Sequence, residues 1–239
     1  MILVTGDTHR DFQRIFALLG RFTWGPDDLL IILGDVGINY FGGIQDRKVK
    51  IMLAWELPMP LMCVHGNHER RPESLGTYSE VPWKGGTAYV EPDFPKLIFA
   101  KDGEIYDLDG MKTVVLGGAA SPDKYARLAN GWGWWPDEEP SEEIKARAEA
   151  SLVAAGWKVD VVLSHAAPAS FAREILAQGS PGVKIKQWAP ELWLEQIENR
   201  LEYKAWFCGH YHRDLAVPNP RRGVKFRCVN HDILELVLP

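Results

Sequence analysis

The stretch LLIILGD, residues 29–35, places an uninterrupted apolar run directly before Gly34 and Asp35. Apolar residues at every position, rather than at alternate positions, are typical of a β-strand that is covered on both faces. Similar runs recur at residues 2–7, 61–67, 113–119, 159–165 and 205–210. The sequence therefore predicts a set of short, buried strands distributed along the whole chain.

Helical patterns lie between several of these runs. In residues 11–20, the apolar side chains Phe12, Ile15, Phe16 and Leu19 follow the i, i+3, i+4, i+7 spacing and form one stripe. Further helices are expected over residues 44–56, over residues 189–202, and from an N-cap at Ser141 to a stop at Gly156.

Other segments indicate antiparallel strands. Asp102-Gly103 and Asp109-Gly110 separate short β-like runs, and Asp-Gly favours the type I′ turn of a hairpin. Residues 224–230 and 233–238 predict two closing strands. Together with the strand–helix–strand units, these hairpins predict an α/β fold of two packed sheets flanked by helices. Because no repeat or linker divides the chain, we expect one domain over residues 1–239, with a Trp-rich irregular insertion at 120–140.

Composition excludes several classes of protein. The formal charge of −5 argues against a protein that coats nucleic acid by neutralising phosphates. We expect no signal peptide, because the first residues form a strand-like run without a basic region, and no apolar stretch approaches the ~20 residues of a membrane span. Cys63, Cys208 and Cys228 form no CxxC pair, which indicates free thiols in a reducing compartment. We expect a cytoplasmic protein without membrane association; its oligomeric state stays open.

Polar residues that carry chemistry follow the predicted strands at their C-terminal ends, where α/β sheets bind ligands. They are Asp7 and His9, Asp35, Asn67 and His68, His165, and finally His210 and His212. Carboxylate, imidazole and amide groups suit divalent ions such as Mn²⁺, Fe²⁺ or Zn²⁺, and no thiolate is offered. His210 and His212 are expected to point the same way, because alternate residues of an extended segment share a face.

The blocks D-x-H, G-D, G-N-H-E, H and G-H-x-H, in this order over residues 7–212, resemble the calcineurin-like metallophosphoesterase superfamily. The segment GWGWWPDEEPS (131–141) is similar to that of a small bacterial and phage-type, single-domain subgroup. The resemblance implies a four-layer αββα sandwich of two mixed β-sheets flanked by helices. It also implies two metal sites that share Asp35: one formed by Asp7, His9, Asp35 and His212, the other by Asp35, Asn67, His165 and His210. We expect two divalent ions, Mn²⁺ first, with Fe, Zn, Ni or Mg as alternatives.

Two cations that share Asp35 would lower the pKa of a water between them, and the resulting hydroxide would attack a phosphate that they neutralise. His68 is next to a ligand but outside the implied ligand set, so it is the candidate general acid for the leaving alcohol. Its alternative role is to orient Asn67. The sequence predicts a phosphoesterase, with diesters slightly preferred. The alternatives are a phosphomonoesterase or phosphoprotein phosphatase, a nuclease, and a metal-free scaffold on the same fold.

Substrate contacts are less clearly marked. Arg70 could hold phosphate oxygens, and Asn39 could line the mouth of the site. The phosphoprotein phosphatases of the superfamily carry an arginine in the second block, which GDVGINY (34–40) lacks. The tryptophans of 131–135 could stack on a nucleobase or aryl ester, or could fill a gap against the core. We expect a small phosphate ester as the partner, with nucleic acid as a less favoured alternative.

Overall fold

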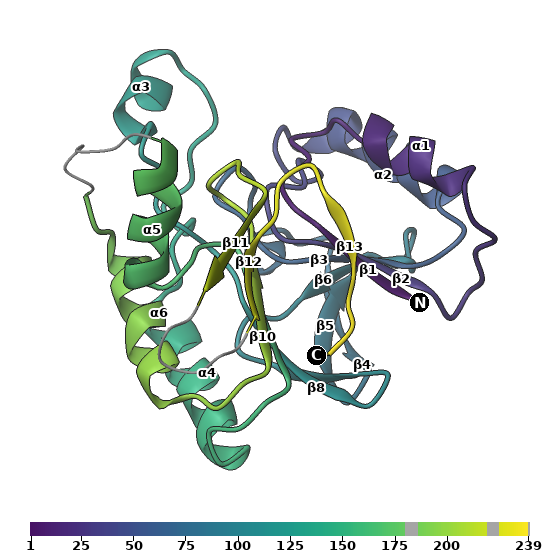
Figure 1. Ribbon diagram of the computed structural model, residues 1–239. Coiled ribbons are helices and arrows are strands. Elements are labelled where there is room, and N and C mark those ends of the chain that lie inside the picture. Colours follow the sequence, from purple (N-terminus) through teal and green to yellow (C-terminus); the bar gives the residue numbers. More distant parts are fainter. Residues whose placement is uncertain (180–185, 219–224, 239) are drawn as a thin grey trace.

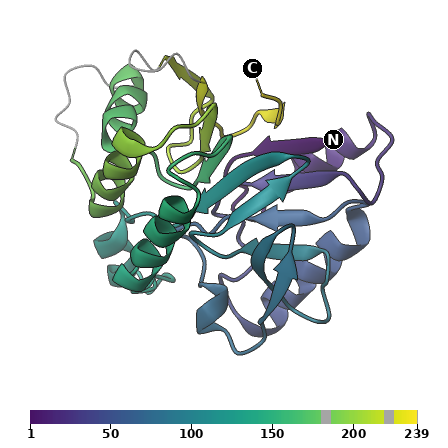
Figure 2. The same ribbon diagram turned by 90° about the horizontal axis from the view of Figure 1, so that it is seen from below.

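The computed structural model describes residues 1–179, 186–218 and 225–238. Within these residues the chain forms two β-sheets, of seven and six strands, that pack face to face. Helices cover both outer faces (Figure 1), and the view from below shows the same layers (Figure 2). Both sheets combine parallel and antiparallel strands. This architecture confirms the predicted four-layer αββα sandwich.

The first sheet has the strand order β13-β1-β2-β3-β6-β5-β4. Neighbours from β1 to β6 in this order are parallel, and the other pairs are antiparallel. Its strands are β1 (Ile2–Thr5), β2 (Leu29–Ile32), β3 (Leu61–Cys63), β4 (Ser79–Trp83), β5 (Gly86–Val90), β6 (Leu97–Ala100) and β13 (Ile233–Glu235).

The second sheet has the order β11-β12-β10-β9-β8-β7, with antiparallel pairs at its two edges and parallel pairs between them. Its strands are β7 (Ile105–Leu108), β8 (Met111–Leu116), β9 (Val161–Ser164), β10 (Ala205–Cys208), β11 (Leu215–Pro218) and β12 (Lys225–Cys228). The predicted strands 224–230 and 233–238 correspond to β12 and β13, which belong to different sheets; residues 224 and 239 lie outside the described part.

The helices divide between the two outer layers. α1 (Gln13–Leu19) and α2 (Gly43–Glu56) lie over the first sheet, while α4 (Glu142–Ala154), α5 (Ala169–Gly179) and α6 (Ala189–Arg200) lie over the second (Figure 1). Ser141 caps α4 as predicted, with its Oγ accepting a hydrogen bond from the Ile144 N–H. A 3₁₀ turn spans Pro72–Ser74. No helix in the described ranges is long and apolar enough to cross a membrane.

Strand β2 shows why its sequence is apolar at every position. Leu29 and Ile31 face the core between the two sheets, whereas Leu30 and Ile32 face the core beneath α1 and α2. The two sets alternate because successive side chains of a strand point to opposite faces. All four residues are buried, so neither face of β2 offers a position for a polar side chain.

Of the two hairpins predicted from Asp-Gly dipeptides, the structure contains one. Asp109-Gly110 joins the antiparallel strands β7 and β8, and both residues have positive φ (54° and 82°), as predicted for a type I′ turn. The predicted hairpin at Asp102-Gly103 is wrong, because β6 and β7 belong to different sheets. Asp102 is instead buried at this crossover, where its carboxylate accepts a hydrogen bond from the Gly117 N–H (2.7 Å).

The segment 120–140 is less irregular than predicted, since it contains helix α3 (Lys124–Ala129). It also contributes buried polar side chains, namely Ser121, Arg127 and Glu138. Ser121 forms hydrogen bonds with both Glu138 and Arg127, and none of the three faces solvent. The segment is therefore part of the packed structure next to the strand ends.

Candidate metal centre

The residues predicted to bind metal gather at one edge of the molecule, because the parallel strands of both sheets end there. In the first sheet they follow β1, β2 and β3, and in the second they follow β9 and β10. They are, in that order, Asp7 and His9, Asp35, Asn67, His165, and His210 with His212.

Glycines before the candidate ligands allow the loops that carry them to approach closely. A Cβ on Gly34, whose φ is +96°, would lie 2.2 Å from the Nδ1 atom of His165. A Cβ on Gly66 would lie 2.1 Å from the backbone nitrogen of Asp35. Both distances are far below van der Waals contact, so a larger residue at either position would push the ligand loops apart.

The first group of candidate ligands consists of Asp7, His9 and His212. The Nε2 atoms of His9 and His212 lie 3.1 Å apart, and His212 Nε2 lies 3.2 Å from Asp7 Oδ2. One ligand atom from each of the three residues lies within 4.8 Å of the other two. The three side chains therefore converge on a volume that a single cation fits.

The second group contains His165, Asn67 and His210. His165 Nε2 lies 3.0 Å from Asn67 Oδ1, while its Nδ1 is 2.7 Å from the backbone carbonyl of Leu33. The carbonyl fixes the tautomer with the proton on Nδ1, which leaves Nε2 directed at the site. The His210 ring lies beside the His165 ring, with the centroids 5.0 Å apart.

Asp35 lies between the two groups. Its Oδ2 atom is 3.8 Å from His9 Nε2, and its Oδ1 atom is 3.5 Å from His165 Nε2. The two oxygens of one carboxylate thus face histidines of different groups. This is the arrangement that the sequence resemblance implies for a ligand shared by two ions.

His210 and His212 face the cluster for a different reason than predicted. They do not lie on an extended segment: both have left-handed backbone conformations, with φ of 69° and 51°, in the turn after β10. Histidine adopts this conformation more readily than most residues. Tyr211, between them, donates a hydrogen bond to Glu191 Oε1 (2.9 Å) and is directed away from the ligands.

The pKa values in the cluster are shifted because carboxylates and imidazoles are buried side by side. Burial alone would raise the pKa of Asp35, but the neighbouring His165 outweighs it and holds that pKa well below its ordinary value. Burial would conversely lower the pKa of His165, but Asp35 raises it to about 9. Both shifts have one origin, because ionised carboxylates that are removed from water require positive charge nearby.

The donors of the cluster fit divalent ions. Asp7 Oδ2 is buried and accepts no hydrogen bond, whereas Asp7 Oδ1 accepts one from the His210 N–H (2.9 Å). An unsatisfied buried carboxylate oxygen costs free energy unless a cation binds it. Carboxylate, imidazole and amide oxygen are also the donor set of Mn²⁺, Fe²⁺ and Zn²⁺.

A hydrogen-bond chain that sequence reasoning missed holds Asn67 from behind. Asn67 Nδ2 donates to Ser121 Oγ (2.9 Å), and the Ser121 hydroxyl donates to Glu138 Oε2. The Ser121 N–H donates to the other carboxylate oxygen of Glu138 (3.0 Å). This chain turns the Asn67 carbonyl oxygen toward His165. The available signal was the position of Ser121 shortly after β8, where it resembles the other strand-end residues.

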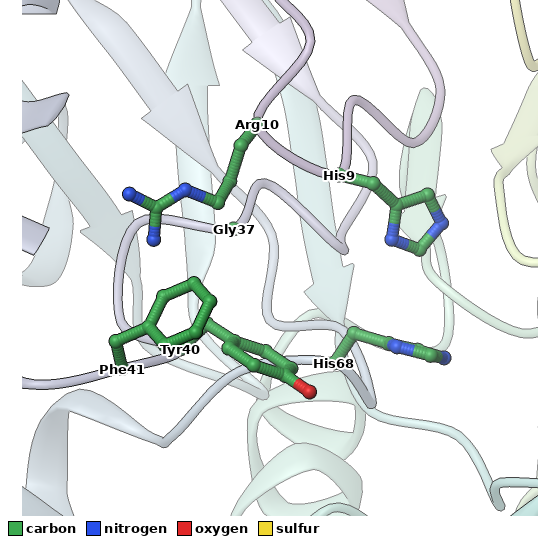
Figure 3. Close-up of a pocket in the computed structure, with 6 residues that line it drawn as sticks. All are labelled: His9, Arg10, Gly37, Tyr40, Phe41 and His68. Carbon is green, nitrogen blue, oxygen red and sulfur yellow. The ribbon is translucent and has the colours of Figure 1, made fainter. Parts of the chain in front are cut away.

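His68, the predicted general acid, lies at the edge of the cluster. Its ring is half-buried and lies 5.0 Å from the His9 ring between centroids, and the backbone N–H of His68 donates to Asp35 Oδ1 (2.8 Å). Burial lowers the pKa of His68 from its ordinary value, although Asp35 acts in the opposite direction. Together with His9, His68 lines a cavity of about 300 Å³ that adjoins the ligands (Figure 3).

The residues predicted to contact substrate lie outside the lining of this cavity. Asn39 is buried, accepts a hydrogen bond from the Tyr78 hydroxyl (3.1 Å), and lines a neighbouring cavity instead. The Arg70 guanidinium lies 6.0 Å from the Trp135 ring centroid, and Arg70 is half-buried. Substrate contact by Asn39 and Arg70 stays a prediction. Arg71, in contrast, forms a buried ion pair with Asp102.

The fold and the cluster of buried carboxylates and imidazoles define a metal-binding α/β sandwich protein. The sequence model of the calcineurin-like phosphoesterase family matches residues 1–214, and the chain belongs to this family. It is therefore a metal-dependent phosphoester hydrolase, as the order of its motifs predicts.

Comparisons with individual proteins are more distant. No match was found among curated proteins. The phosphopantetheinyl hydrolase from Mycobacterium tuberculosis is a similar solved structure, with 15% identity, a TM-score of 0.45, and coverage of 96% of this chain and 89% of that chain. The anchor in the inner membrane complex of Plasmodium is another, with 10% identity, a TM-score of 0.45, and coverage of 96% and 70%.

Proposed function

We propose that the chain hydrolyses a small phosphate ester at a centre of two divalent ions, and that it prefers diesters to monoesters. The observation that carries this proposal is the position of Asp35. Its two carboxylate oxygens face His9 and His165, which belong to separate ligand groups. A carboxylate in this position is suited to join two ions a few ångströms apart.

Each residue that we assign to the two ions directs a donor atom into the cluster at the strand ends. The first ion would be held by Asp7, His9, Asp35 and His212, and the second by Asp35, Asn67, His165 and His210. When bound, a pair of divalent ions supplies a water that is deprotonated near neutral pH and neutralises the charge of the phosphate. Mn²⁺ is the proposed metal, and Fe, Zn, Ni and Mg are the alternatives.

His68 is proposed to donate a proton to the leaving alcohol oxygen. Its backbone N–H is fixed to Asp35 Oδ1, so the ring is held at the boundary between the ligands and the cavity. Protonation of an alkoxide by a positioned imidazole contributes about 10²–10⁴-fold in rate. The slight preference for diesters rests on this proton donor, because the alkoxide that leaves a diester benefits most from protonation, although a monoester also needs it.

An activity screen tests the proposal. Purified protein with Mn²⁺ is offered a monoester and a diester of the same alcohol, a cyclic nucleotide and single-stranded DNA, with Asp35→Asn as the control for contaminating phosphatases. We expect the highest kcat/KM on a diester. Faster turnover of the monoester would overturn the diester preference, and preferred cleavage of DNA would favour a nuclease. Hydrolysis of no ester by the wild type would contradict the proposed function.

The setting of this activity is also a proposal. All three cysteines are buried and free, which suits a reducing compartment such as the cytoplasm. We propose a cytoplasmic enzyme whose partner is its small phosphate-ester substrate.

A further inference from the structure

The cavity beside the metal ligands has two chemically different ends (Figure 3). His9 and His68 form one end, while Tyr40 and Phe41 form the other, and the Arg10 guanidinium lies on the Phe41 side. Its volume of about 300 Å³ lies at the lower limit of small-molecule pockets. A compact ester therefore fits the cavity better than a polymer does, with its phosphate at the histidine end and its alcohol part at the aromatic end.

The aromatic end is fixed from behind. The Tyr40 ring packs edge-on against Phe41 (4.7 Å between centroids) and against Trp135 (5.2 Å). The guanidinium of the buried Arg127 lies 5.9 Å from the Tyr40 ring. Rings held in this way lose little conformational freedom when a ligand binds, and preorganisation of this kind favours affinity.

Arg10 adds a flat surface rather than a free charge. Its Nη1 atom is 3.0 Å from Asp46 Oδ1, a buried carboxylate that neutralises it. The Arg10 guanidinium lies 4.7 Å over the centre of the Phe41 ring. Gly37 makes room for this arrangement, since a Cβ there would be 2.4 Å from Arg10 Cγ. Arg10 is thus already paired and offers no free charge to a second anionic group.

We infer that Tyr40 and Phe41 bind an aromatic ring on the alcohol part of the substrate, so that the substrate class is a phosphate ester that carries a nucleobase or an aryl group. This inference rests on the proposed function for the position of the phosphate. The ring would stack against the exposed side of Phe41, which is 52% accessible to solvent. The shared chemistry is a flat π-system, and either a nucleobase or an aryl group provides it.

A binding measurement tests the cavity without any hydrolysis. The full chain is titrated by calorimetry, in chelator and again with Mn²⁺, with two pairs of phosphate-free alcohols: adenosine against ribose, and benzyl alcohol against cyclohexylmethanol. We expect the aromatic member of at least one pair to bind about tenfold more tightly. Phe41→Ala should remove that difference. Trp55→Ala, which removes an aromatic ring that is 86% exposed on α2, should preserve it.

Steady-state kinetics with matched pairs of esters provide a second test of the aromatic site. The ester pairs are adenosine 5′-phosphate with ribose 5-phosphate, and benzyl phosphate with cyclohexylmethyl phosphate, each also offered as its methyl diester. We expect kcat/KM to be about tenfold higher for the aromatic ester, mainly through KM. A preference in the adenosine pair alone identifies a nucleobase, and a preference in the benzyl pair alone identifies an aryl group; both support the inference.

The two hypotheses fail in different ways. In one outcome, both members of each ester pair are hydrolysed at similar kcat/KM and the paired alcohols bind equally well. This outcome would overturn the aromatic site but would still support the proposed phosphoesterase function. The opposite outcome is selective binding of an aromatic alcohol, loss of that selectivity in Phe41→Ala, and no hydrolysis of any ester. This outcome would support the aromatic site and contradict the proposed function.

Discussion

The Nε2 atoms of His9 and His212 lie 3.1 Å apart, although 203 positions separate the two residues in the sequence. Each atom also lies within 4 Å of Asp7 Oδ2, which is buried and accepts no hydrogen bond. Two imidazole nitrogens and a carboxylate oxygen that converge in this way could together hold one divalent cation.

His68→Ala should preserve metal binding and lower kcat by about 10²–10⁴-fold on esters of alcohols with high pKa, because only the leaving alkoxide depends on the proton donor. The loss should shrink as the pKa of the leaving alcohol falls. The measurement is kcat for a series of esters, together with the metal content of each preparation. Unchanged turnover of the ester with the poorest leaving group would remove His68 from the role of acid.

Ser121→Ala should weaken metal binding by about 10–100-fold, since the Asn67 amide would lose the partner that orients it. Calorimetric titration of metal-free protein with Mn²⁺ measures this change. The matched control is Ser74→Ala, whose hydroxyl also bonds a carboxylate of this region, Asp137, but contacts no predicted ligand. Equal affinities of the two variants would contradict the orienting role of Ser121.

Arg71→Ala should lower the free energy of unfolding by about 3–5 kcal/mol, because it leaves the carboxylate of Asp102 buried without its cation. Arg47→Ala removes a cation from the exposed pair with Asp93 and should cost less than about 1 kcal/mol. Urea denaturation of both variants provides the comparison. Similar losses of unfolding free energy in the two variants would show that the buried pair stabilises the fold no more than the exposed pair does.

Glu191 should make stability fall as pH rises. Burial raises the pKa of Glu191 above its ordinary value of 4.5, against the hydrogen bonds from the Trp188 N–H and the Tyr211 hydroxyl. As pH rises, the unfolded chain therefore releases the Glu191 proton before the folded chain does. The contribution of protonated Glu191 to the free energy of unfolding is fully present below pH 4.5 and is lost as pH rises through the pKa of the folded state. In Glu191→Gln the decline should be smaller, as measured by urea midpoints from pH 4 to 7. The exposed Glu174→Gln should follow the wild type; an identical slope in Glu191→Gln would refute the assignment.

The parts of the fold that were predicted are those with a local signature. Strands such as β2 and β3 are apolar at every position because both of their faces are buried. The polar residues that follow these strands were recognisable as candidate ligands because the parallel strands of each sheet end at one edge. The hairpin of β4 and β5 lacked this signature, since β4 is largely exposed and contains Pro82.

Other features depend on contacts that no local pattern contains. The dipeptides at Asp102 and Asp109 have the same turn chemistry, yet only the second joins paired strands. Ser121 meets Asn67 across 54 positions, and the sequence offers no motif for that meeting. The left-handed turns at His210 and His212 follow from the way the chain leaves β10, not from alternation along a strand.

The stoichiometry of metal binding tests the central claim, that Asp35 joins two ions, most directly. The measurement is elemental analysis and calorimetric titration with Mn²⁺ for the wild type, for Asp35→Asn, and for the exposed control Asp93→Asn. We predict two ions per chain in the wild type and in the control, and at most one, bound more weakly, in Asp35→Asn. A wild type that binds no more metal than Asp35→Asn would contradict the account.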